Sequence, residues 1–239
     1  MSLYRDHGVI LRSWKLGEAD RIVSIITRDN GKVRAVAKGV RKPSSRFGAR
    51  LEPTCHVSLQ LYRGRGDLDT VTQVETIDRY VSLRADLDRW ARASAMLEAV
   101  EQVSLEREPN ERLFEMLVRA LGTLSTSESP LVGAGFFLKL LALEGFEPVV
   151  DVCVACGEEG PLIAFDVGEG GTTCASCQRG TRVSPDTLEL LQWILGGRLG
   201  LALAAPPSAA THAVDVLATR MLEHQLERRL RSMGVLEQH

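Results

Sequence analysis

The sequence predicts an α+β protein, in which a small N-terminal barrel of five strands precedes an α-helical domain. Up to about residue 80 the chain alternates β-branched runs with turn residues, whereas from residue 81 its apolar residues recur at helical spacing. The charge changes at the same point. Residues 1–80 contain fifteen Lys/Arg and nine Asp/Glu, while the remainder contains fourteen and twenty-two. We therefore expect two domains, 1–80 and 81–239.

Five strands are expected in the first domain. The clearest pair is 21–27 with 31–40, because the intervening Asp29-Asn30-Gly31 favours a two-residue type I′ hairpin turn. The others are expected at 6–15, 55–63 and 69–77. Five short strands in about 75 residues are typical of a small barrel. The OB-fold is a five-stranded barrel of this kind, and it binds oligonucleotides on one face.

The second domain contains several helical patterns. Helices are expected at 84–103, 112–121, 131–146, 185–195 and 209–233. Leu83, Leu87 and Trp90 begin the apolar face of the first of these helices. Asn110 is a suitable N-cap for the helix expected at 112–121. Ser184 precedes the proline at the first position of the helix expected at 185–195. The segment 131–146 is apolar almost all round, so we expect it at the buried centre of the bundle.

Four of the five cysteines form a C-x2-C-x17-C-x2-C pattern, made by Cys153, Cys156, Cys174 and Cys177. This spacing predicts a site that binds one Zn²⁺ through four thiolates, in an insertion at about 151–182. Four thiolates close the coordination shell, whereas a catalytic zinc keeps one position open, so the predicted role is structural. A thiol redox protein is the alternative, but it needs only one CxxC pair.

Acidic residues surround these cysteines, so we expect a phosphate-binding surface in the first domain instead. Residues 28–50 contain eight Lys/Arg and one acid. Because successive side chains of a strand point to opposite faces, the even-numbered Lys32, Arg34 and Lys38 are expected on the same face. A charge run can be merely a solvated face, but solubility alone produces mixed signs. The predicted DNA contacts are Lys32, Arg34, Lys38, Arg41, Lys42, Arg46 and Arg50.

Aromatic side chains are few in this segment. It contains only Phe47, with Tyr62 and Trp14 on neighbouring expected strands. OB-folds that hold single strands tightly stack bases on aromatic rings. We therefore expect binding here to be mainly electrostatic, tolerant of sequence and sensitive to salt.

Other functions receive less support from the sequence. The N-terminal segment has charges and no apolar h-region, and 131–146 is too short to span a bilayer, so a cytoplasmic protein is expected. The chain contains no GxxxxGK[ST] phosphate loop and no HExxH zinc motif. Cys55 and His56 are neighbours on an expected strand and point to opposite faces, which favours a buried thiol and an ordinary histidine over a catalytic pair.

The segment GEADRIVSIITRDNGKVRAVAKGVRKPSSRFGARLEP (17–53), the helical body and the late four-cysteine module resemble the bacterial RecO family of the RecF pathway. The resemblance covers essentially the whole chain. It implies an OB-fold that binds single- and double-stranded DNA, a helical domain and a zinc module. It also implies annealing of complementary strands, partnership with RecR and the tail of the single-strand binding protein SSB, and help in loading RecA, without catalysis. The alternative is a nucleic-acid-processing enzyme, or its RNA-binding subunit, built on a barrel and a zinc ribbon.

Overall fold

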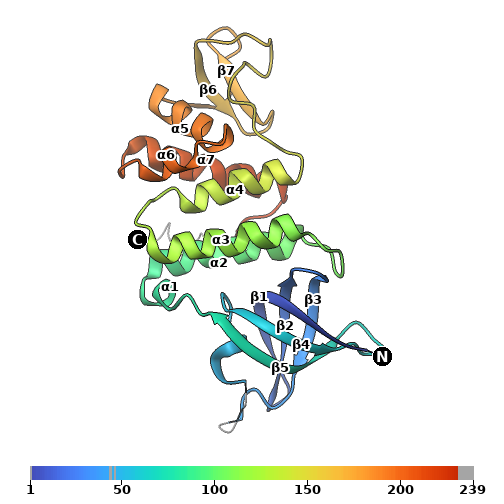
Figure 1. Ribbon diagram of the computed structural model, residues 1–239. Helices are drawn as coiled ribbons and strands as arrows, with labels where there is room; N and C mark the ends of the chain where they lie inside the picture. The colour runs from blue at the N-terminus through green and yellow to red at the C-terminus, as the bar shows by residue number, and fades with distance from the viewer. Residues whose placement is uncertain (1, 43–44, 46, 231–239) are drawn as a thin grey trace. The chain divides into compact units, whose positions relative to one another are not determined.

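The computed structural model describes residues 2–42, 45 and 47–230, and the chain forms two compact units (Figure 1). The first unit runs to Thr126 and includes Leu230, and the second comprises Ser127–Arg229. The helices that follow the barrel up to Thr126 therefore belong to the same compact unit as the barrel. None of the described helices is both long enough and apolar enough to span a membrane.

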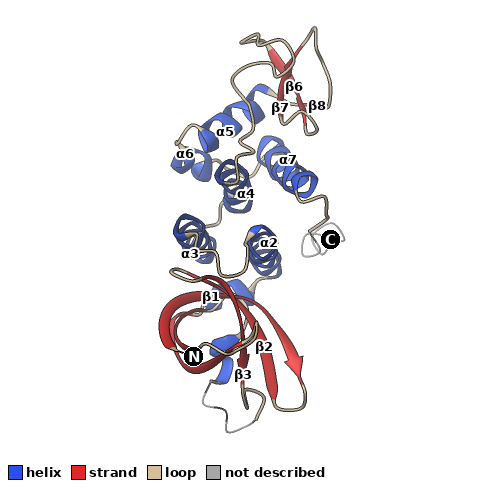
Figure 2. Ribbon diagram, turned by 90° about the vertical axis from the view of Figure 1, so that its right-hand side faces the viewer, coloured by secondary structure: helices blue, strands red, loops and turns tan. Residues whose placement is uncertain are grey.

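The first unit contains the expected closed barrel of five strands. These strands are β1 (Leu3–Leu16), β2 (Asp20–Thr27), β3 (Gly31–Ala37), β4 (His56–Tyr62) and β5 (Asp69–Asp78). Their order around the barrel is β1-β2-β3-β5-β4, and among these pairs β3–β5 is the parallel one. Figure 2 shows the strands curving round into this barrel, which is the predicted OB-fold.

The inside of the barrel is filled by every second residue of its strands. Ile25, Ala35 and Val57 are fully buried there, as expected from the period of two in a strand. A short 3-10 helix, η1 (Gly48–Leu51), lies in the connection between β3 and β4, and Leu51 packs into the same core.

The β2–β3 hairpin is confirmed, but the predicted type I′ turn is wrong. Thr27 pairs with Gly31, so the loop comprises the three residues between them, and Gly31 has the positive φ of 67°. The reason is tertiary. The buried carboxylate of Asp6 accepts hydrogen bonds from the Asn30 side-chain amide at 2.7 Å and from the backbone N–H of Asp29 at 3.3 Å.

The first helical segment of the sequence forms two helices instead of one. These are α1 (Val81–Ala85) and α2 (Leu87–Val103), and the extended Asp86 between them accepts a hydrogen bond from the Arg89 N–H at 2.8 Å. Asp86 caps the start of α2, and α1 ends at the residue before it. Leu87 is therefore 53% exposed and does not belong to a buried apolar face. The next helix, α3 (Glu111–Thr126), has the predicted cap, because Asn110 Oδ1 accepts from the Leu113 N–H at 3.0 Å.

The second unit is helical and contains a small sheet. Its helices are α4 (Val132–Leu143), α5 (Pro185–Leu195), α6 (Leu199–Ala204) and α7 (Ala209–Gln225). The sheet has the order β7-β6-β8, with β6 (Leu162–Asp166), β7 (Gly171–Cys174) and β8 (Thr181–Arg182). Helix α4 is buried as predicted and packs against α7. The sequence did not predict α6, and the predicted last helix was too long, because α7 ends at Gln225.

Candidate nucleic-acid interface and metal centre

The four predicted cysteine ligands converge on one point. One sulfur from each of Cys153, Cys156, Cys174 and Cys177 lies within 4.8 Å of the other three. The Sγ atoms of Cys156 and Cys174 are 3.7 Å apart. Zinc–sulfur bonds of about 2.3 Å in a tetrahedron place neighbouring sulfurs about 3.8 Å apart, so the donor set fits a tetrahedral metal ion.

Local backbone turns position the two cysteine pairs. After the first pair, the Gly157 N–H donates to the Cys153 carbonyl at 2.8 Å, and Gly157 has a positive φ of 79°. In the second pair, the Cys177 N–H donates to the Cys174 carbonyl at 3.3 Å. Each turn brings two sulfurs to one side, and the pairing of β6 with β7 holds the second turn within the module.

The electrostatics of the cluster also suit a bound cation. A backbone hydrogen bond from Cys174 is the largest of several influences that lower the pKa of the Cys153 thiol to about 6. Hydrogen bonds with the sulfurs of Cys156 and Cys174 raise the pKa of the Cys177 thiol to about 12. Four sulfurs this close cannot all carry negative charge by themselves, whereas a dication among them would stabilise four thiolates together.

The predicted DNA-contacting residues fall into two groups in the structure. Lys32 and Arg34 face the end of α2 and the connection between α2 and α3. The Lys32 Nζ donates to the Glu101 carbonyl at 2.7 Å, and the Arg34 Nε lies 2.7 Å from the Glu106 carboxylate. The two side chains lie on the same strand face, as predicted, but α2 and the connection after it already contact that face.

The second group lies where β3 ends and the chain turns towards η1. Lys38, Arg41, Lys42 and Arg50 are exposed there, and Arg46 lies outside the described residues. Together these four described residues define the basic end of the barrel.

The β1–β2 turn adjoins the basic end. The Arg41 N–H donates to the Ala19 carbonyl at 3.0 Å, and its guanidinium donates to the Gly17 carbonyl at 3.1 Å. Asp20 accepts from the Gly39 N–H at 2.7 Å, which holds the two turns together. The turn also brings the exposed Lys15 and the exposed acid Glu18 to this end of the barrel. Sequence analysis missed Lys15 because it lies outside 28–50, and β1–β2 pairing was the signal that could have found it.

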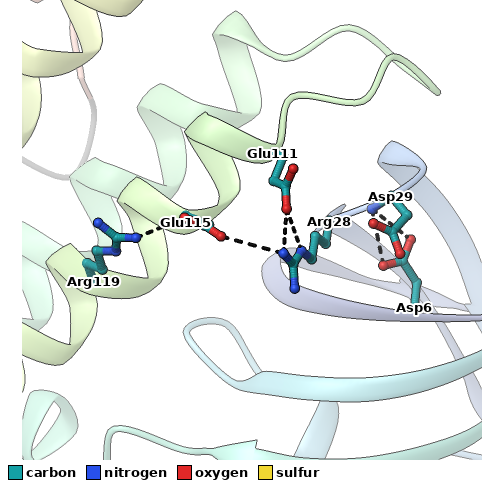
Figure 3. Close-up of polar contacts among 6 residues, drawn as sticks. All are labelled: Asp6, Arg28, Asp29, Glu111, Glu115 and Arg119. Carbon is teal, nitrogen blue, oxygen red and sulfur yellow. Dashed lines mark hydrogen bonds and ion pairs between the residues drawn. The ribbon is translucent and has the colours of Figure 1, made fainter.

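A series of ion pairs and hydrogen bonds joins the barrel to α2 and α3. We call it the polar seam, and on the barrel side it comprises Arg28, Lys32 and Arg34. Arg28 forms a charged hydrogen-bonded pair with Glu111 and lies 3.6 Å from Glu115, as Figure 3 shows. Arg28, Lys32 and Arg34 therefore each have a partner on α2, on α3 or on the connection between them.

A second buried contact supports the seam at the start of β5. Asp69 is fully buried and accepts a hydrogen bond from the Tyr4 hydroxyl at 2.5 Å. Arg107, on the connection between α2 and α3, donates to the same carboxylate at 3.0 Å. A buried carboxylate with both a hydroxyl and a guanidinium as partners is a stable arrangement, so it ties this connection to the barrel.

A closed OB barrel with a basic end, followed by helices and a four-cysteine metal module, defines a nucleic-acid-binding OB-fold protein. Residues 1–80 match the family model described as Recombination protein O N terminal, and residues 84–234 match Recombination protein O C terminal. Together these matches cover nearly the whole chain. The chain therefore belongs to the recombination protein O (RecO) family, which acts as a mediator of DNA recombination and repair rather than as a catalytic enzyme.

Proposed function

We propose that this chain binds single- and double-stranded DNA through the basic end of the barrel and anneals complementary strands there. The observation that carries the proposal is the division of the cations. Lys38, Arg41, Lys42 and Arg50 are exposed at one end, whereas Lys32 and Arg34 hold the barrel to its helices. Arg46, which lies outside the described residues, is proposed as a further DNA contact from its place in the sequence. Lys32 and Arg34 act as positioning residues in this proposal.

Annealing follows from the physics of such a surface. Two DNA strands repel each other through their phosphates, and a cluster of Lys and Arg lowers that repulsion while it holds both strands. Contacts to phosphate carry no sequence information, so any complementary pair can be brought together. Because contacts of this kind weaken as the salt concentration rises, the strands are bound reversibly.

Family membership supports the wider role. We propose that the chain acts with RecR and with the C-terminal tail of SSB, and helps to load RecA onto SSB-coated single-stranded DNA. Its place would be the bacterial nucleoid in the cytoplasm, where that DNA is found. The match to both RecO models favours this mediator over a nucleic-acid-processing enzyme.

The four-cysteine cluster is proposed to hold one Zn²⁺ in a structural role. Four thiolates in a tetrahedron suit Zn²⁺, and four protein ligands leave no position for water or substrate. The bound ion would join the two turns of the module, at Cys153 and Cys174, into one folded unit.

A salt series of DNA binding tests the proposed surface. The double variant Lys38→Glu with Arg41→Glu removes two cations that would bind phosphate and adds two repulsive charges. We expect weaker binding of a labelled single strand and a flatter dependence on salt, by about 0.7 in slope for each phosphate that the variant no longer neutralises. Fluorescence anisotropy measures both quantities.

The matched control is Arg112→Glu with Arg220→Glu, which makes the same change in net charge at two exposed residues far from the basic end in sequence. This control should bind almost as the wild type does. Equal decreases in affinity for the two double variants would mean that net charge alone governs binding, and the proposed surface would then be wrong.

A further inference from the structure

The outer face of the barrel has a row of three apolar side chains across β1, β2 and β3. Trp14 pairs with Ile22, and Ile22 pairs with Val36, so all three lie side by side on one face. The alternate residues Val23 and Ala35 point into the barrel core and are fully buried. The three residues of the outer face are each only half-buried, and we call them the apolar row.

The helices of the unit contact the barrel on one side of the apolar row. In the adjacent row, the Ser24 hydroxyl donates to the Glu101 carboxylate at 2.6 Å, and Arg34 pairs with Glu106. Ser24 is fully buried, whereas the residues of the apolar row are partly exposed. The apolar row therefore lies beside the polar seam and retains accessible surface.

Cations border the apolar row on both sides. The Arg12 guanidinium lies over the Trp14 ring, 5.1 Å from its centroid, and Arg12 is exposed. On the other side, the exposed Lys38 follows Val36 by two residues, and Arg41 is held against the β1–β2 turn. An indole beside apolar side chains, bordered by cations, is complementary to bases and their phosphates.

Phe47, the aromatic residue of the basic segment, is not available for base stacking. Phe47 is only 2% exposed because its ring fills the barrel core beside Leu51. The sequence-based expectation of mainly electrostatic binding rested on the single aromatic in 28–50, with Trp14 and Tyr62 placed only on neighbouring expected strands. The strand pairing of β1 with β2 supplies one from outside that segment, because it places Trp14 beside Ile22.

We propose that Trp14, Ile22 and Val36 form a platform on which bases of single-stranded DNA stack, and that the Arg12 guanidinium moves from the indole to the adjacent phosphate when a base binds. The bases of a duplex are stacked on each other and do not present their faces. The platform therefore gives the chain a preference for single strands over duplex, which charge alone does not provide. This inference rests on the proposed function and deepens it.

The test compares Trp14→Leu with the wild type, using a labelled oligo(dT) strand and a labelled duplex of equal length. Leucine keeps an apolar side chain on the face but removes the aromatic ring. We expect the affinity for the single strand to fall at least about fivefold, as for the loss of one stacked base. Duplex affinity and the salt slope should stay the same, and Trp14→Phe should retain most of the single-strand affinity.

Fluorescence supplies a second measurement that does not depend on the leucine variant folding well. The chain has three tryptophans, so in a Trp90→Phe with Trp193→Phe background the indole of Trp14 alone remains. Stacking predicts that oligo(dT) quenches its emission and that the duplex does not.

The outcomes separate this inference from the proposed function. If Trp14→Leu leaves single-strand affinity unchanged while Lys38→Glu with Arg41→Glu abolishes it, the basic end stands and the platform is wrong. If Trp14→Leu lowers single-strand and duplex affinity equally, Trp14 is structural and the platform is again overturned. If neither variant affects binding, both proposals fail and the apolar row is left for a protein partner.

Discussion

His56 illustrates how a single residue can make the barrel sensitive to pH. It lies on β4, with the His7 ring 6.3 Å away on β1 and the Phe114 ring 5.8 Å away on α3, measured between ring centroids. Within the described part of the chain, its Nε2 is buried without a hydrogen-bond partner. Burial first, and then the neighbouring His7, lower the pKa of His56, while Asp78 opposes them.

The lowered pKa of His56 determines how its contribution to stability changes with pH. A histidine whose pKa is lowered by folding stays neutral in the native state, whereas in the unfolded chain it takes up a proton below its ordinary value of about 6.5. His56 therefore contributes stability that is complete above pH 6.5 and decreases as the pH falls below it. We expect urea unfolding to show a larger loss of stability from pH 7.5 to pH 5.5 in the wild type than in His56→Gln. An identical loss in the two proteins would exclude this role.

The polar seam is the feature that matters at the scale of elements. It joins β3 and the β2–β3 loop to α2, α3 and the connection between them, so the helices set the orientation of the hairpin. The approach is closest at Gly31, where an added Cβ would collide with the backbone carbonyl of Glu108. Because the clashing atoms belong to the backbone, a rotamer change cannot relieve the clash, as it could for a side chain.

Substitution of Gly31 measures how tightly these elements are joined. Gly31→Ala should destabilise the first unit by at least about 2 kcal/mol, because it adds a steric clash to the strain of a positive φ. Gly17→Ala is the matched control, since Gly17 also has a positive φ, of 58°, but an added Cβ would meet nothing within 4 Å. It should cost only about 1 kcal/mol. Urea denaturation gives both values, and equal costs would mean that the contact with Glu108 adds nothing.

At the scale of the whole molecule, the two compact units divide the work that we propose. The first unit contains the barrel, the basic end and the apolar row, and the second contains the four-cysteine cluster. Structural metal sites contribute free energy to the folding of the segment that surrounds them. Metal loss is therefore expected to affect the second unit first.

A cysteine substitution tests this division. Cys153→Ser should abolish zinc binding and lower the melting temperature and solubility, while the DNA affinity of each folded molecule remains unchanged. Zinc content, thermal unfolding and anisotropy are the measurements. Cys55→Ala provides the control, because Cys55 is buried in the barrel core and its loss should leave the zinc content intact. Unchanged stability together with abolished DNA binding would place the function on the zinc module instead.

Features that depend on neighbours along the chain could be predicted from the sequence alone. Period-two alternation gives the strands, Asn110 and Ser184 begin helices, and the CxxC spacing brings together sulfurs that local turns can hold. These signals are local because side-chain direction and cap geometry depend on a few adjacent residues.

The sequence could not show which cations of 28–50 pair with the helices, because that depends on tertiary contacts. Parity puts Lys32 and Arg34 on the outer face, but Glu101 and Glu106, about 70 positions further along the chain, already contact that face. Likewise, Phe47 belongs to the core and Trp14 does not, because β1 closes against β2 and η1 packs into the barrel. What a side chain meets depends on contacts between distant segments, and no local pattern in the sequence encodes those contacts.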